Sequence, residues 1–302
     1  MTTRSGAARP VVVGIESHAH HRVPLAWATD EAARRRLPLV VVHAHGMPTP
    51  TGAEGRLPSW QEWHDTADRA AEDTLAQAVT FAESRHPDLA VSGLLAEGEP
   101  SWVLREQGAE AEMLVLGSRK LSARQELFTS ASVAVPVSAH APCPVVVVRE
   151  WEHAAEQEPF LVVGVDGSPA SQAAVDFAFE EAALRNAQLR ALFVWQRPLL
   201  GVLDEEAALG ECRETLYEAV TGRRESHPDV ELHHEVMTGH PVEVLVRESR
   251  HALALVTGTR GLGGFAGMLL GSVSQGALHH AQCPVITVPS RDDRDRPPPH
   301  RR

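Results

Sequence analysis

Glycine and hydroxyl residues in the last quarter of the chain have the spacing of a phosphate-binding loop. The pattern runs Gly258-Thr259-Arg260-Gly261, continues for nine residues and closes on Gly271-Ser272. Glycine lets a backbone approach an anion closely, and a helix beginning at Ser272 would direct free N–H groups and its positive dipole end at a phosphate. We therefore predict a phosphate site here; the alternative is that the glycines only form a mobile turn.

The segments around this pattern are those that such a loop requires. An apolar run at 253–257 precedes it, and a helix-like stretch and a second apolar run at 284–288 follow it. Short continuous apolar runs are typical of strands buried on both faces. The setting is therefore strand, loop, helix, strand.

The chain contains two copies of one unit. Val11 to Ile15 resembles the run that ends at Gly164-Val165, with Gly14 aligned to Gly164 at an offset of 150. Cys143-Pro-Val and Cys283-Pro-Val align at an offset of 140. Such a repeat is as long as a whole domain. We predict domains at 9–149 and 159–290, followed by a disordered tail at 291–302.

Composition narrows the class of protein. The 302 residues suffice for two domains, and 43% of them are hydrophobic. The formal charge of −12 argues against nonspecific binding to nucleic acid or anionic lipid. No apolar run is long enough to span a membrane, and residues 1–10 lack the apolar core of a signal peptide. Three cysteines form no disulfide framework, so we expect a cytoplasmic protein.

Strands and helices are expected to alternate in each copy. In the second copy, Ser168-Pro169 provides a helix start, with the serine as cap. The expected strands are 161–165, 189–195, 231–237, 253–257 and 284–288, and the expected helices begin at Ser168, Asp204, Pro241 and Ser272. This order predicts an α/β fold in which helices cover both faces of a parallel sheet.

Three motifs together resemble the universal stress protein family. They are the Gly-x2-Gly-x9-Gly-Ser pattern, the turn Val165-Asp166-Gly167-Ser168 after the first strand, and the Cys-Pro-Val entry to the last strand. The resemblance covers nearly the whole chain as a tandem pair. It implies two doubly wound, Rossmann-like domains with five-stranded parallel sheets, ATP binding in many members, and pairing through the last strands, either between the two domains or in a homodimer.

In such a sheet the first and fourth strands are neighbours, and ligands bind beyond their carboxyl ends. Asp166 and Gly258 should therefore line one crevice. The resemblance further implies that Val165 and Asp166 lie along the nucleotide and that the backbone near Val194 contacts adenine. A carboxylate repels polyphosphate, so Asp166 suggests a ribose contact or a shared Mg²⁺. The candidate ATP-binding residues are Gly164, Val165, Asp166, Val194, Gly258, Thr259, Arg260, Gly261, Leu262, Gly263, Gly264, Gly271, Ser272 and Val273.

The first copy departs from this pattern. Glu16 replaces Asp166, Lys120 replaces Gly261, and Ala131-Ser132 replaces Gly271-Ser272. Pro136 should also shorten or kink the following helix. We expect one strong nucleotide site, with the first copy kept for packing or regulation.

Histidines and tryptophans suggest other sites less strongly. The densest of the 17 histidines are His18, His20 and His21, but nothing completes a zinc ligand set around them. We interpret these, His43, His45 and the pairs at 233–234 and 279–280 as surface or cap residues, and Trp60 and Trp63 as packing residues.

No set of residues indicates an enzyme. A Walker loop is absent, and only Asp166 and Arg260 are candidates for phosphoryl transfer. The first hypothesis is an ATP-binding stress or regulatory protein with at most slow ATP hydrolysis. The second is a scaffold of the same fold that binds no nucleotide. An adenylating transferase is disfavoured because the first strand lacks the Ser-Gly-Gly-x-Asp-Ser loop.

Overall fold

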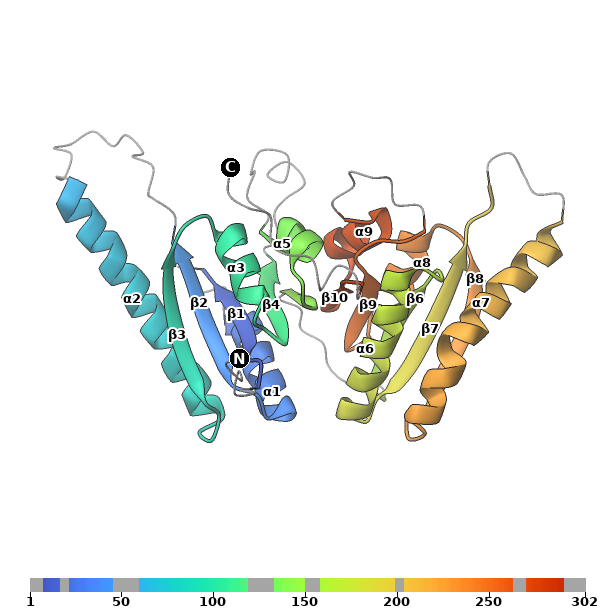
Figure 1. Ribbon diagram of the computed structural model, residues 1–302, viewed down its shortest axis with the longest axis horizontal. Helices are drawn as coiled ribbons and strands as arrows, with labels where there is room; N and C mark the ends of the chain where they lie inside the picture. Colours follow the sequence, from blue (N-terminus) through green and yellow to red (C-terminus); the bar gives the residue numbers. More distant parts are fainter. Residues whose placement is uncertain are drawn as a thin grey trace, which may run out of the picture.

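Two similar α/β halves form the molecule, as the computed structural model in Figure 1 shows. The structure describes residues 8–16, 22–45, 60–118, 133–149, 158–198, 204–262 and 270–290. The predicted tail at 291–302 lies outside these residues. The first copy contains β1 (Val11–Ile15), α1 (Arg22–Arg35), β2 (Leu39–His45), α2 (Trp60–Arg85), β3 (Val91–Glu97), α3 (Pro100–Gly108), β4 (Met113–Ser118), α5 (Ala134–His140) and β5 (Val145–Arg149).

The second copy repeats this order. It contains β6 (Phe160–Val165), α6 (Pro169–Arg185), β7 (Gln188–Trp195), α7 (Glu205–Ser226), β8 (Leu232–Thr238), α8 (Pro241–Glu248), β9 (Ala254–Gly258), α9 (Ser272–His280) and β10 (Val285–Val288). Ser168 caps α6, Pro169 opens it, and Asp204 caps α7, as the sequence predicts. The α/β fold with two doubly wound units is confirmed.

One sheet runs through both copies. Its strand order is β3-β2-β1-β4-β5-β10-β9-β6-β7-β8, and the strands within each copy are parallel. At the centre β10 lies antiparallel to β5, with Ile286 opposite Val146. Each last strand thereby covers the edge of the other, which removes two exposed apolar edges.

Both copies open toward the same side of the molecule. Neighbouring strands are rotated by roughly 20–25°, so the seven steps from β2 to β7 add to roughly 140–175°. Together with the antiparallel step at the centre, this returns β7 to nearly the direction of β2, as the arrowheads in Figure 1 show. At the centre, where β5 and β10 are antiparallel, the carboxyl end of each strand lies beside the start of the other.

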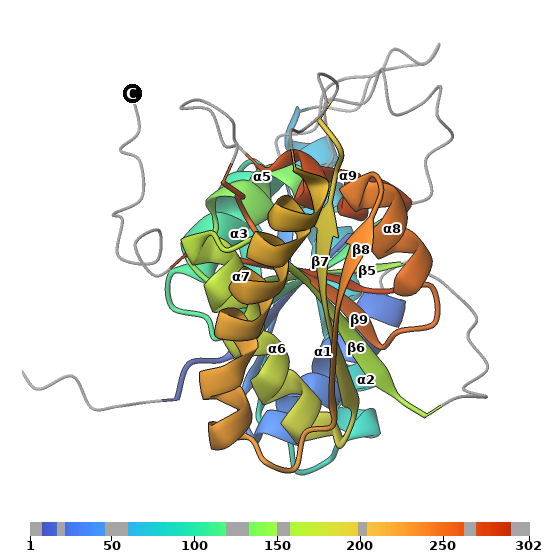
Figure 2. The same ribbon diagram turned by 90° about the vertical axis from the view of Figure 1, so that its right-hand side faces the viewer.

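Helices cover the two faces in matching sets. Figure 2 shows α6 and α7 on one face of the second copy and α8 and α9 on the other. One apolar core contains residues of α1 and α6, and the other contains residues of α3, α5, α8 and α9. Each core includes residues of β5 and β10, so both continue across the junction between the copies.

A buried cluster of charges joins α1 to α6. Glu31 and Glu181 are both fully buried, and they occupy equivalent positions in the two copies. Arg185 of α6 reaches Glu31 at 2.6 Å and also pairs with Glu181. Arg35 of α1 contacts Glu31 at 2.5 Å and pairs with Glu181. Each carboxylate therefore has a guanidinium from its own copy and one from the other.

Aromatic rings flank this cluster in the same reciprocal way. Arg185 lies 5.6 Å from the ring centroid of Trp27 in the first copy, and Arg35 lies 5.7 Å from that of Phe177 in the second. Within the part of the chain that the structure describes, no helix is long and apolar enough to cross a membrane.

Arg185→Leu should lower the free energy of unfolding by about 3 kcal/mol, because it leaves two buried carboxylates short of one guanidinium. Urea unfolding followed by circular dichroism measures this change. Arg34→Gln is the matched control, since Arg34 contacts the same Glu31 at 2.8 Å from a more exposed position and should cost less than about 1 kcal/mol. Equal losses of unfolding free energy in the two variants would show that the buried charge cluster does not stabilise the junction.

Candidate functional site

The first and fourth strands of the second copy bring Asp166 to the glycine loop. β6 and β9 are parallel neighbours, with Val163 opposite Val256. At their carboxyl ends Asp166 Oδ2 accepts a hydrogen bond from the Leu262 N–H at 3.2 Å. A Cβ atom added to Gly261 would lie 2.3 Å from the same carboxylate oxygen. The two segments therefore meet so closely that a side chain at position 261 would have to displace the Asp166 carboxylate.

The other two glycines of the pattern also permit close backbone contacts. A Cβ at Gly258 would lie 2.7 Å from the carbonyl carbon of Ala170 and 2.8 Å from the Ser171 nitrogen, in the first turn of α6. A Cβ at Gly271 would lie 3.3 Å from the Thr259 carbonyl oxygen, which accepts the Gly271 N–H at 2.8 Å. The loop thus packs against α6 at one end and against the start of α9 at the other.

Three serines that sequence reasoning did not assign to the site hold the loop. Ser168 Oγ donates to the Arg260 carbonyl at 3.2 Å, and Ser171 Oγ accepts the Asp166 N–H at 3.1 Å. Ser274 Oγ donates to the Gly258 carbonyl at 2.5 Å. Only Ser168 gave a sequence signal, as a helix cap. Hydroxyl contacts to distant carbonyls have no spacing that a sequence reveals.

The loop's N–H groups are not all available to an anion. The Thr259 N–H donates to the Val288 carbonyl at 3.0 Å, and the N–H groups of Gly271 and Leu262 are bonded as described above. Two of the candidate loop residues therefore have N–H groups that are already bonded: Thr259 to the Val288 carbonyl and Leu262 to Asp166.

The start of α9 presents N–H groups instead. Gly271 is its N-cap residue and provides no side-chain hydrogen bond, in contrast to Ser168 of α6. The first intrahelical bond runs from the Gln275 N–H to the Gly271 carbonyl at 2.9 Å. The N–H groups of Ser272, Val273 and Ser274 consequently lack intrahelical acceptors. Ser272 is exposed at this end of the helix.

Two polar groups of the loop add to its chemistry. Thr259 is 3% exposed, and within the described ranges its hydroxyl finds no hydrogen-bond partner. Arg260 is half-buried and places a positive charge near the first copy. Burial lowers the pKa of His140 at the end of α5, and the charges of Arg105 and Arg260 lower it further. The glycine loop of the second copy therefore lies close enough to act on the first.

Other predicted residues have packing roles. A Cβ at Gly164 would lie 3.1 Å from Leu245 Cδ1, so this glycine makes room for α8. Val165 is buried in the core under α6, and Val273 packs on the opposite core. Val194 is a half-buried residue of β7. Gly263 and Gly264 lie outside the residues that the structure describes.

Only part of the first copy's corresponding crevice is described. Glu16 directly follows β1, and Gly117 is the second-last residue of β4. Lys120, Ala131, Ser132 and the histidines at 18, 20 and 21 lie outside the described residues. α5 has seven residues where its counterpart α9 has nine, which agrees with the expected shortening. It begins at Ala134, so Pro136 falls in its first turn, where the missing N–H costs no intrahelical hydrogen bond. The expectation for His43 is wrong: it is not a surface residue but is 2% exposed, and its Nδ1 lies 3.0 Å from the Ile15 carbonyl oxygen.

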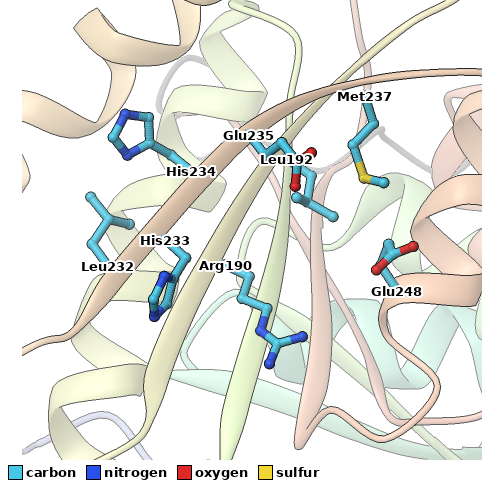
Figure 3. A pocket seen from close by; sticks show the side chains of 8 residues that line it. All are labelled: Arg190, Leu192, Leu232, His233, His234, Glu235, Met237 and Glu248. Carbon is cyan, nitrogen blue, oxygen red and sulfur yellow. The ribbon is translucent and has the colours of Figure 1, made fainter.

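A cavity of about 580 Å³ lies elsewhere, on the open sheet face of β7 and β8 beside α8. Figure 3 shows that Arg190, Glu235 and Glu248 line it together with apolar side chains. Arg190 lies 3.9 Å from the ring centroid of Phe160. The lining carries charges of both signs and includes no residue of the glycine pattern, so this cavity is separate from the glycine loop.

Metal and thiol chemistry have little support. Across the described segments, no three histidine, cysteine or acidic side chains converge as metal ligands would. Burial raises the pKa of the Cys283 thiol to about 11, so this thiol is protonated at neutral pH and is a poor nucleophile.

The fold and the crevice define a class: doubly wound α/β proteins with a glycine loop after the fourth strand, here seen in the second copy. The model of the universal stress protein family matches residues 7–149 and again residues 161–289. The chain belongs to the universal stress protein family.

Relatives share the tandem length. A universal stress protein of Mycobacterium tuberculosis is 34% identical over 284 residues, which cover 92% of this chain and 96% of its own. One from Mycolicibacterium smegmatis is 31% identical over 288 residues, covering 93% of this chain and 97% of its own.

Solved structures show the same fold. A universal stress protein from Archaeoglobus fulgidus has a TM-score of 0.72 at 17% identity, with 94% of this chain and 97% of its own covered. A protein from Pseudomonas aeruginosa described as a putative universal stress protein has a TM-score of 0.63 at 18% identity, with 95% of each chain covered.

Gly258→Ala should destabilise the protein by about 1–3 kcal/mol, because its Cβ would overlap the backbone of Ala170 and Ser171. Gly210→Ala in α7 is the matched control: its Cβ would meet nothing within 4 Å, so it should stabilise the helix by up to about 1 kcal/mol. Urea midpoints compare the two variants. A shift of the same sign in both would contradict the close contact at Gly258.

His140 should make stability depend on pH. Since its pKa is lowered in the folded state from the usual 6.5, the folded protein binds this proton less tightly than the unfolded chain. The contribution of neutral His140 to the free energy of unfolding is complete above pH 6.5. It is lost as the pH falls from there through the lower pKa that His140 has in the folded protein. We expect His140→Gln to lose less stability than wild type between pH 7 and pH 5 in urea unfolding.

The same residue reports on the proximity of the copies. Arg260→Gln should raise the pKa of His140, as measured by NMR titration of its ring protons, because one repelling charge is removed. An unchanged titration would place Arg260 too far from the first copy to act on it.

Proposed function

We propose that the second copy binds a nucleotide through its phosphates, in the crevice between the ends of β6 and β9, and that ATP is this nucleotide. One observation carries the proposal: the uncapped start of α9 lies beside glycine positions at which any side chain would crowd the loop. Helix N-termini of this kind favour anions through their N–H groups and dipole.

The buried hydroxyl of Thr259 supports the same proposal. A buried hydroxyl without a partner costs about 1–3 kcal/mol, and a ligand oxygen or a water would recover this cost. The positive charge of Arg260, on the same loop, also favours an anionic ligand. ATP in place of another nucleotide is proposed from the family resemblance.

Asp166 restricts how the phosphates lie. Its Oδ1 accepts the Ser168 N–H at 3.0 Å and its Oδ2 accepts the Leu262 N–H, so both oxygens are fixed. Carboxylate oxygens have further lone pairs, and Mg²⁺ is commonly held by one carboxylate and the phosphates of its substrate. One carboxylate, that of Asp166, is compatible with Mg²⁺ bound through ATP; the alternative is a contact to ribose.

We propose a regulatory role for this site, in which nucleotide occupancy changes the conformation or partner affinity of the protein during a stress response. The division into domains at 9–149 and 159–290, with nucleotide in the second alone, belongs to this proposal. ATP hydrolysis is secondary, because a positioned base has no clear candidate besides Asp166.

A scaffold that binds no nucleotide is the second candidate. The bond from Leu262 N–H to Asp166 favours it, because the carboxylate satisfies a donor that a phosphate would use. The two candidates differ in one measurable property, which is nucleotide content.

The purified protein should release ATP or ADP on heat denaturation, and millimolar ATP with Mg²⁺ should raise its melting temperature. Gly261→Lys should weaken ATP binding at least tenfold, because its side chain would displace Asp166 and fill the loop. Gly222→Lys adds the same side chain to α7, where a Cβ meets nothing within 4 Å, and should bind like wild type.

An empty wild-type protein with no thermal shift would overturn the nucleotide proposal in favour of the scaffold. Hydrolysis is decided separately: ADP formed beyond one equivalent per chain would show turnover.

A further inference from the structure

One side chain of the first copy holds the helix that presents N–H groups in the second. Arg149 is the last residue of β5, and its guanidinium donates to the carbonyl of His279 at 2.9 Å and to that of Leu278. Both carbonyls belong to the last turn of α9, where acceptors have no intrahelical donor. A cation at this end also complements the helix dipole.

The two ends of α9 thus have different partners. At its N-terminus, Ser274 Oγ and the Gly271 N–H tie the helix to the loop through the carbonyls of Gly258 and Thr259. Its C-terminus is held by Arg149 of the other copy. The nine-residue helix is only about 13 Å long. A shift of its C-terminal end therefore also moves the N–H groups at its N-terminal end.

This contact has no counterpart in the reverse direction. Residue 289, which corresponds to Arg149 at the offset of 140, is proline and has no side-chain donor. Within the described residues, position 289 therefore supplies no guanidinium to the equivalent helix α5. Arg149 of the first copy thus contacts a helix of the second copy, which is the copy with the intact glycine pattern.

Partial burial and a charged donor strengthen the hydrogen bonds from Arg149 to α9. Arg149 is half-buried, and Leu278 is 4% exposed in the core shared by α5, α8 and α9. Hydrogen bonds from a charged donor are about twice as strong as neutral ones. Removal of the guanidinium would leave both carbonyls without this donor.

We propose that Arg149 is a positioning residue for the nucleotide site of the second copy, so that the first copy forms a structural part of that site. The inference rests on the proposed function. Arg149 touches the helix and not the nucleotide, and acts by fixing where the N–H groups of Ser272 and Val273 lie.

The test compares three variants by calorimetric titration with ATP and Mg²⁺. Arg149→Gln should weaken binding about five- to tenfold, because a neutral amide replaces the bidentate cation. Arg149→Lys should recover most of the affinity, since an ammonium group also bonds helix C-terminal carbonyls. Arg223→Gln is the control: Arg223 bonds the Ala219 carbonyl at 2.7 Å and Asp176 at 2.6 Å, away from α9, and its loss should change affinity less than twofold.

Amide hydrogen exchange without nucleotide provides a second readout. Arg149→Gln should speed exchange in residues 272–280 selectively, whereas Arg223→Gln should not. If wild type binds ATP and Arg149→Gln binds equally well, or if Arg223→Gln weakens binding as much, the positioning role is wrong while the nucleotide site stands. If wild type binds no nucleotide, the proposed function is wrong and this inference falls with it.

Discussion

The antiparallel contact between β5 and β10 is the interaction on which the rest of the structure depends. It merges two five-stranded sheets into one, lets both apolar cores continue across the junction, and brings α1 against α6. The contact spans only three residue pairs, so the ion pairs of Glu31 and Glu181 and the bonds of Arg149 supply directional contacts around it. The orientation of the two crevices follows from this arrangement and from the twist of the sheet.

Backbone proximity is the second constraint, and it acts within the second copy. The loop after β9 touches Asp166, the first turn of α6 and the start of α9, and each contact coincides with a glycine. Serine hydroxyls fix the carbonyls of this loop, while the helix end is left uncapped. These contacts surround N–H groups that are free of intrahelical partners, which is the arrangement that the proposed anion site requires.

Much of this was predictable from the sequence because it depends on local rules. Apolar runs predicted the strands, Ser168 and Asp204 predicted helix starts, and the internal repeat predicted two similar units. Hydrogen bonds between distant residues were not predictable: Asp166 to Leu262, Ser168 to Arg260 and Arg149 to α9 depend on tertiary placement alone. His43 was misjudged for the same reason, since the burial of a side chain is set by tertiary packing.

The reciprocal charge cluster has a consequence for how the two copies differ. In a symmetric dimer of one short chain, every substitution appears twice, so a residue that suits one subunit is imposed on the other. Glu31 with Glu181 and Arg35 with Arg185 still obey that two-fold relation. Arg149 and Pro289 do not. Covalent joining of the copies therefore releases each position from its duplicate, which is the condition for the unequal roles proposed for Arg149 and the glycine loop.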